Sequence, residues 1–175
     1  GETCVMCNVV MSPKPREGVD FFPLNVEYEE KLYAAGRIPG SFMRREGRPG
    51  ERAILTSRVV DRPMRPLFPK EMRNDVCITM TVMSLDPDCS PEIAGMIGAS
   101  LVTAVSDIPW NGPIGGVQVG LVDGEIVLNP TKEQRERSDL ALTLAASMEK
   151  IVMIEAGANE VTEEVMMDAI KAGHE

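Results

Sequence analysis

The segment "GRIPGSFMRREGRPG", residues 36–50, sets the firmest limit on what this chain can fold into. It contains four glycines and two prolines. Glycine weakens helices and strands through its conformational freedom, and proline removes a backbone donor, so no regular element can run through this segment. We therefore predict an irregular, solvent-exposed loop over residues 37–50, in a position where function is more common than in a core.

The predicted loop is basic, although the chain as a whole is acidic. The formal net charge is -9, yet residues 37–73 hold ten Lys/Arg against four Asp/Glu. Residues 74–131 hold no Lys or Arg and seven acids. A focused positive patch can hold a polyanion, whereas the overall acidity argues against non-specific coating of nucleic acid. Ion pairs within the domain are the alternative, and it is weakened because Glu46 is the only acid in the loop.

The length of 175 residues suffices for one domain with a sizeable core, so we predict a single domain over residues 1–175. No apolar run approaches the roughly 20 residues that cross a bilayer. We therefore expect a soluble, cytoplasmic protein with no membrane partner. The chain opens in a strand-like run without an initiating Met, so we expect a piece of a longer polypeptide, truncated at its N-terminus.

Hydrophobic periodicity predicts an α+β (α/β) fold, with a sheet, hairpins and covering helices. The hairpin turn is expected at Asp123-Gly124, because Asp-Gly favours the tight turns that join antiparallel strands. The predicted strands cover residues 3–11, 75–85, 140–147 and 150–157, the predicted hairpin covers residues 117–130, and a short extended segment is expected at 21–30. The predicted helices cover residues 51–68, interrupted at Pro63 and Pro66, then 90–107 behind the N-cap Ser90, and 162–173, capped by Thr162 or Asn159 and ended by Gly173.

The predicted loop carries side chains of the types that bind single-stranded nucleic acid. Guanidinium groups of Arg44 and Arg45 match phosphate oxygens in a bidentate manner. The Phe42 ring can stack on an unpaired base, and the Met43 thioether lies next to it in sequence. This combination favours single-stranded RNA held without sequence preference.

A second basic cluster, Arg58, Arg62 and Arg65, follows the loop. Spacings of four and three residues place these arginines on one face of a helix. They extend the predicted polyanion site, or they form a solvated helix face with Asp61 and Glu51 as partners. Both interpretations stay open at this point.

The remaining reactive residues favour structural roles. Asp61 is expected to pair with Arg58 or Arg65, and Asp86 and Asp88 sit in a turn sequence that suits their backbone hydrogen bonds. His174 follows a predicted helix end, where a capping or dipole role is favoured. The four cysteines lack the spacing of a zinc site or a redox site, so we expect buried small hydrophobes and no metal in this chain.

Four motifs carry a family resemblance over essentially the whole chain. In order they are "YAAGRIPGSFMRREGRPGERAILTSRVVDRPMRPLFP", "SPEIAGMIGASLVTAVSDIPWNGPIGGVQVG", "LNPT" and "AIKAGHE". The chain resembles the first ribonuclease PH-like core of bacterial polynucleotide phosphorylase. The resemblance implies a ribonuclease PH-like βαβα core, with a mixed sheet and covering helices.

The resemblance also implies an activity for the parent enzyme. That activity is 3′-to-5′ phosphorolysis of RNA, in which inorganic phosphate releases nucleoside diphosphates and the reverse reaction is polymerisation. Family members are ring-shaped homotrimers that use Mg²⁺ or Mn²⁺, bound by a second core. The residues that match the RNA constriction and the RNA path are Phe42, Met43, Arg44, Arg45, Arg58, Arg62 and Arg65.

Two departures from the family limit what the isolated chain can do. Met43 stands where the family places a second aromatic residue, and its thioether can pack on a base but offers no aromatic face for stacking. The second core is absent, so we assign no catalytic residue and expect this chain alone to be inactive. The alternatives are a self-sufficient single-core ribonuclease PH-like nuclease, a non-catalytic trimer scaffold domain, and a general anion-binding module.

Overall fold

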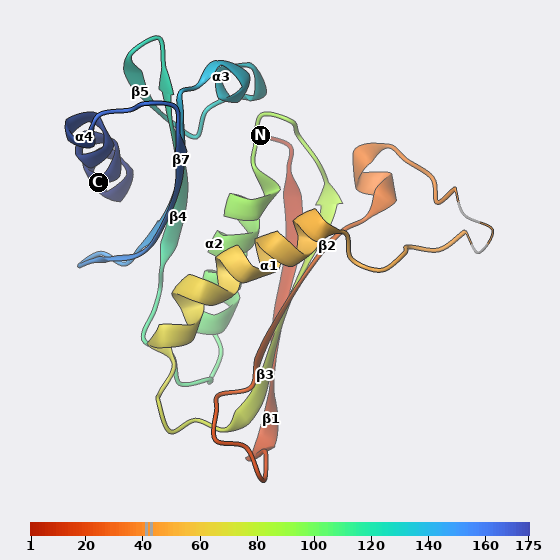
Figure 1. Cartoon of the computed structure of the whole chain (residues 1–175). Helices are drawn as coiled ribbons and strands as arrows, with labels where there is room; N and C mark the ends of the chain where they lie inside the picture. Colours follow the sequence, from red (N-terminus) through yellow and green to blue (C-terminus); the bar gives the residue numbers. More distant parts are fainter. Residues whose placement is uncertain (41, 43) are drawn as a thin grey trace.

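The computed structural model describes residues 1–40, 42 and 44–175, arranged as two sheets with helices between and around them (Figure 1). The strands are β1 Cys4–Pro15, β2 Leu24–Glu30, β3 Asn74–Ser84, β4 Gly115–Val122, β5 Glu125–Leu128, β6 Leu140–Ala146 and β7 Ile151–Ala158. The helices are α1 Glu51–Met64, α2 Pro91–Ala104, α3 Lys132–Arg137 and α4 Glu163–His174, with 3₁₀ turns η1 Leu32–Ala35 and η2 Arg65–Leu67.

The first sheet is mixed, with strand order β1-β3-β2. Strand β1 pairs antiparallel with β3, and β2 pairs parallel with β3. A parallel pair needs a long crossover, and the chain makes it through η1, the basic loop and α1. The crossover therefore carries both arginine clusters along one side of this sheet.

The second sheet is antiparallel, with strand order β5-β4-β6-β7. The predicted Asp123-Gly124 turn is confirmed: both residues have positive φ, 52° and 84°, as the tight turn between β4 and β5 requires. Helix α4 covers the outer face of this sheet, and α2 lies between the two sheets (Figure 1).

The main core lies between the first sheet and helices α1 and α2. Val60 and Met64 of α1 are fully buried, together with Ile78 and Met80 of β3 and Met96 of α2. Buried positions of α1 recur at helical spacing, so its arginines are left on the outer side. A smaller cluster packs α4 against the second sheet.

Glycines of α2 allow close packing, as the small residues of this helix predict. A Cβ added to Gly98 would lie 2.5 Å from the Cys7 sulfur on β1, and one at Gly95 would lie 3.2 Å from the Met80 sulfur on β3. These contacts show that the small residues of α2 serve close packing, so no phosphate-binding loop is needed to explain them.

Several local expectations are wrong. Helix α1 runs through Pro63 to Met64, because a proline in the last turn costs only one intrahelical hydrogen bond. Helix α4 runs past Gly173, where the missing side chain makes room for Val119 of β4. The short helix α3 and the 3₁₀ turn η1 were not predicted.

The cysteines are only partly as expected. Cys4 is exposed, whereas the other three are half-buried. Cys4 and Cys7 point to opposite faces of β1, as residues three apart in a strand must. Burial raises the pKa of the Cys7 thiol, which packs against α2.

None of the helices in the described ranges combines the length and the hydropathy needed to cross a bilayer.

Candidate nucleic-acid interface

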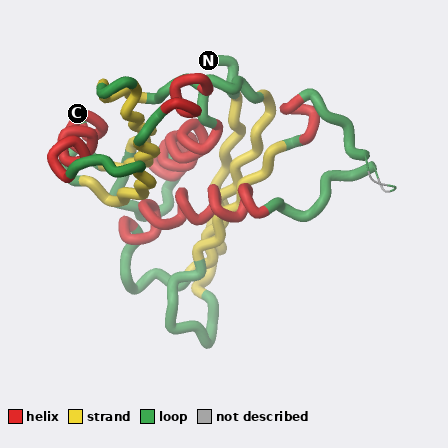
Figure 2. Tube along the Cα trace, turned by 45° about the horizontal axis from the view of Figure 1, so that its top comes forward, coloured by secondary structure: helices red, strands yellow, loops and turns green. Residues whose placement is uncertain are grey.

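The basic loop leaves the body of the protein at one end of the first sheet. It follows η1 at Gly36, whose φ of 67° ends that turn in the left-handed region, and it returns into α1 at Gly50. Figures 1 and 2 show the loop extending away from both sheets before it turns back. Its irregular conformation is confirmed for the described residues of 37–50.

The described side chains at the outer end of the loop are open to solvent. Phe42 is fully exposed, and Arg44 and Arg45 are exposed beside it. Arg44 has a φ of 46°, an uncommon value for a residue with a side chain. Met43, predicted to contact RNA, lies outside the described residues.

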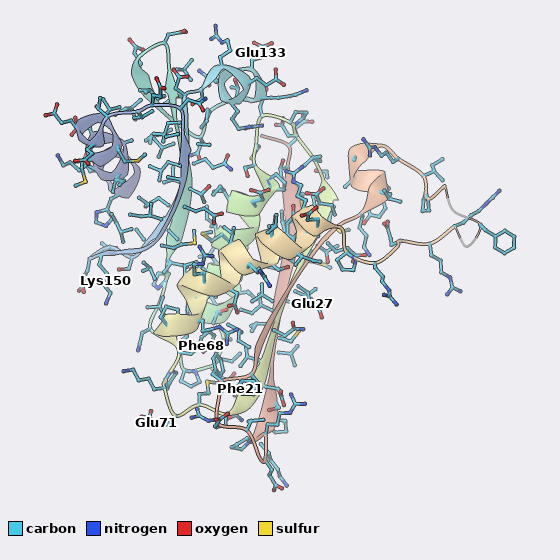
Figure 3. All side chains as sticks on the ribbon, in the orientation of Figure 1. Phe21, Glu27, Phe68, Glu71, Glu133 and Lys150 are labelled. Atoms are coloured by element: carbon cyan, nitrogen blue, oxygen red, sulfur yellow. The ribbon has the colours of Figure 1, made fainter. Side chains whose placement is uncertain are left out.

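The loop arginines differ from most other arginines of the chain in their surroundings. Within the described part of the chain, no carboxylate forms an ion pair with Arg37, Arg44, Arg45 or Arg48. Figure 3 shows the side chains of this loop spread outward, with little protein around them. These guanidinium groups are therefore available to an external anion.

The base of the loop is fastened to the body by hydrogen bonds. The backbone N–H of Leu32 donates to Oε1 of Glu46 at 3.0 Å, and the N–H of Arg37 donates to the Leu32 carbonyl at 2.8 Å. Next to this point, Nζ of Lys31 lies 2.7 Å from Glu29. That hydrogen bond is the main reason why the pKa of Lys31 is raised.

The three helix arginines predicted to contact RNA have different surroundings. Arg58 is exposed, and no ion pair of Arg58 occurs among the described residues. Arg62 reaches Glu155 of β7 at 3.8 Å, with both side chains more than half exposed. Arg65 is bound most firmly and has its own set of partners.

Arg65 links the end of α1 to the start of β2. Its guanidinium donates twice to the Asp61 carboxylate, at 2.9 and 2.6 Å, and also to the carbonyls of Phe22 and Leu24, at 3.0 and 3.2 Å. The expected pairing of Asp61 with a neighbouring arginine is confirmed. Few donors of Arg65 remain free for a phosphate.

An open cavity of about 760 Å³ joins the loop to the helix arginines. Its walls are the inner part of the loop, the outer face of α1 and strand β2. Four arginines line it: Arg48, Arg52, Arg58 and Arg65. Sequence reasoning left Arg48 and Arg52 out of the site, although both lie within the basic segment that contains the predicted contacts.

Acidic residues share this cavity, so it is not uniformly positive. Glu30 accepts a hydrogen bond from the Tyr28 hydroxyl at 2.7 Å and lies 3.9 Å from Arg52. Burial and then the Glu30 hydrogen bond raise the pKa of Tyr28. Arg52 also meets Glu92 of α2, at 3.4 Å, and so holds the start of α1 in place.

The carboxylates elsewhere have structural partners. Asp86 accepts hydrogen bonds from the backbone of Asp88 and Glu2, which lower its pKa in that order. Asp88 accepts from the backbone N–H of Lys132 at 2.8 Å. The residues with described positions hold no group of three or more His, Cys, Asp or Glu that fits a metal ion.

Two family models match the chain along its whole length. The model described as 3′ exoribonuclease family, domain 1, matches residues 1–109, and domain 2 of the same family matches residues 112–175. The chain belongs to the 3′ exoribonuclease family. The boundary between the two matches falls between α2 and β4, where the chain passes from the first sheet to the second.

Relatives of this family member share its sequence over its full length. The chain is 62% identical over 175 residues to the polyribonucleotide nucleotidyltransferase of Ruminiclostridium cellulolyticum, covering 100% of this chain and 25% of the relative. It is 58% identical to the polyribonucleotide nucleotidyltransferase of Clostridioides difficile, and the match covers 99% of this chain and 25% of the relative. The chain therefore spans about a quarter of the length of these curated relatives.

A solved structure supports the predicted fold class. The crystal structure of rice (Oryza sativa) Rrp46 matches with a TM-score of 0.77 at 15% identity, covering 99% of this chain and 78% of the other. At this identity the likeness concerns the fold alone. The predicted α+β fold with a ribonuclease PH-like core is thus confirmed.

Proposed function

We propose that this chain is the RNA-gripping part of a polyribonucleotide nucleotidyltransferase, which degrades RNA from the 3′ end by phosphorolysis. The chain's identity of about 60% to enzymes of that name supports the parent activity. Because the chain spans a quarter of those relatives, the activity, substrate and partners of the whole protein belong to this proposal.

One observation carries the proposed role of this chain. The loop presents exposed arginines without ion-pair partners among the described residues, next to the fully exposed Phe42 ring. Such guanidinium groups attract phosphates, and an exposed ring offers a stacking face to any base. A loop of this kind binds single-stranded RNA without reading its sequence.

We assign different roles to Arg58, Arg62 and Arg65. Arg58 faces the cavity without an ion pair in the described structure, so it continues the RNA path inward from Arg44 and Arg45. Arg62 shares its charge with an exposed glutamate. Arg65 mainly fastens α1 to β2, and any contact it makes with RNA is secondary to that role.

Chemistry requires the rest of the parent enzyme. In the reaction, inorganic phosphate attacks the last phosphodiester and a nucleoside diphosphate leaves, so the RNA is shortened by one nucleotide. In keeping with the family resemblance, Mg²⁺ or Mn²⁺ would be held by a second core of the parent enzyme, and the described residues of this chain offer no fitting ligand group. We further propose a homotrimer in the cytoplasm, in keeping with the family resemblance.

The test of this proposal is fluorescence anisotropy of a labelled oligo(A), titrated with the chain at two salt concentrations. We expect the Arg44→Ala/Arg45→Ala variant to bind at least tenfold more weakly at low salt. Its dependence on salt should also be shallower, by roughly 0.7 in logarithmic slope for each lost phosphate contact. The same samples with phosphate and Mg²⁺ should release no ADP, because the proposal assigns the chemistry to parts of the parent enzyme beyond these 175 residues.

The matched control is Arg16→Ala/Arg137→Ala, which removes the same charge from two exposed arginines that are paired with Asp75 and Asp123. It should leave RNA affinity within about twofold of wild type. An equal loss of affinity in both double variants would mean that net charge, not the loop, governs binding. Detectable ADP release would support a self-sufficient nuclease instead.

A further inference from the structure

Glu46 differs from the rest of the loop in burial as well as in charge. It is half-buried, whereas Arg44, Arg45 and Arg48 around it are exposed. By charge alone, an acid between these arginines weakens the attraction of the loop for a polyanion. Its position therefore calls for a role other than contact with RNA.

The hydrogen bond of Glu46 supplies that role. The Leu32 N–H stands at the start of η1, where helical backbone donors have no partner within the turn. The N-cap residue, Lys31, makes no side-chain cap there. Glu46 supplies the acceptor from fourteen residues further along the chain, with its Oε1 3.0 Å from the Leu32 nitrogen.

Leu32 joins both limbs of the loop at one point. Its carbonyl accepts from the N–H of Arg37 on the outgoing limb, and its N–H donates to Glu46 on the returning limb. The returning limb then enters α1, where Arg52 is held by Glu92. Phe42, Arg44 and Arg45 all lie between these two fastened limbs.

We propose that Glu46 is a positioning residue, whose carboxylate closes the base of the loop and so fixes how Phe42, Arg44 and Arg45 are presented to RNA. This inference rests on the proposed function, because it assigns Glu46 to the same RNA-binding site. A loop closed at its base loses less conformational entropy on binding than an open one, so closure raises affinity.

Two variants separate the hydrogen bond from the charge. Glu46→Gln and Glu46→Ala both remove one negative charge, but only the glutamine retains a side-chain oxygen that can accept from Leu32. We expect Glu46→Gln to bind labelled oligo(A) at least as tightly as wild type. Glu46→Ala should bind about fivefold more weakly than Glu46→Gln, with both variants melting within about 2 °C of wild type.

A matched pair at Glu71 controls for the substitutions themselves. Glu71 is exposed, lies in the same basic segment, and sits far from the loop at the opposite end of the first sheet (Figure 3). Glu71→Gln and Glu71→Ala should bind RNA equally. Equal affinities of the two Glu46 variants would overturn the positioning role.

Hydrogen exchange of the Leu32 amide tests the hydrogen bond without RNA. Exchange should be faster in Glu46→Ala than in Glu46→Gln, and equal rates would also overturn the proposal. If the wild-type chain binds no oligo(A), the proposed function fails. The Leu32 exchange rates then decide by themselves whether Glu46 holds the loop.

Discussion

The loop and helix α1 contain arginines at similar density, but the arginines of the two regions differ in their ion pairs and hydrogen bonds. In the loop, Arg44 and Arg45 are exposed without ion pairs in the described structure. At the end of α1, Arg65 binds a carboxylate and two backbone carbonyls. Arg62 makes one exposed ion pair, and Arg58 makes none that the described residues show.

The difference follows from what packs beside each region. Helix α1 lies against β2, so the Arg65 side chain reaches the carbonyls of Phe22, just before that strand, and of Leu24, its first residue. The loop extends away from both sheets (Figure 1), and among the described residues no carboxylate forms an ion pair with its arginines. The same residue type is thus structural in one place and available for a ligand in the other, and its neighbours decide which.

The largest effect that would sharpen this contrast is expected for Arg65→Ala. The substitution removes the guanidinium that donates to the Asp61 carboxylate and to two backbone carbonyls, so the free energy of unfolding should fall by about 1–2 kcal/mol, allowing for the partial exposure of the group. Urea unfolding of Arg65→Ala, compared with Arg45→Ala as a loop control, measures this. If Arg65→Ala stays as stable as wild type but loses RNA affinity, Arg65 contacts RNA, and the contrast between a structural Arg65 and the accessible loop arginines is wrong.

An intermediate effect is expected for Phe42→Ala. Loss of one stacking face should weaken binding of oligo(A) by about fivefold to tenfold, at the low end of what base stacking contributes. Phe42→Tyr should restore the affinity, since it keeps the ring. Phe21, an exposed phenylalanine outside the loop, provides the control, and Phe21→Ala should bind as wild type does. Equal losses of oligo(A) affinity in Phe42→Ala and Phe21→Ala would show that the loop phenylalanine makes no specific contribution to binding.

The smallest effect is expected for Arg62→Ala. Its ion pair with Glu155 spans 3.8 Å between exposed side chains, and such pairs contribute at most about 1 kcal/mol and often nothing measurable. Urea unfolding should therefore show almost no change. A double-mutant cycle with Glu155→Ala checks this, and a coupling above about 1 kcal/mol would place Arg62 beside Arg65 as a structural residue.

Much of the fold could be predicted from the sequence because its signals are local. Period-two alternation marks β3, and the Asp123-Gly124 turn defines the β4–β5 hairpin. Thr162, one of the two predicted caps, does cap α4, and its hydroxyl accepts from the Val165 N–H. Steric limits and neighbouring hydrogen bonds act within a few residues, so a short window contains them.

Other features depend on contacts between distant residues. Gly173 ends no helix, because α4 continues where its missing side chain makes room for Val119. Helical spacing could not separate the roles of Arg58, Arg62 and Arg65, because it places all three on the same face of a helix. Arg65 finds partners in β2 and in α1, and Arg62 finds one in β7, whereas Arg58 makes no ion pair among the described residues.

The sequence by itself determined that residues 37–50 form an irregular basic loop, since glycine and proline restrict the backbone wherever they occur. Only the tertiary structure decided which arginines remain without ion pairs in the described chain, and that Glu46 reaches Leu32. A hydrogen bond between residues fourteen apart depends on where the returning limb of the loop lies. The packing of α1 against β2 sets that position, and no local pattern of residues encodes it.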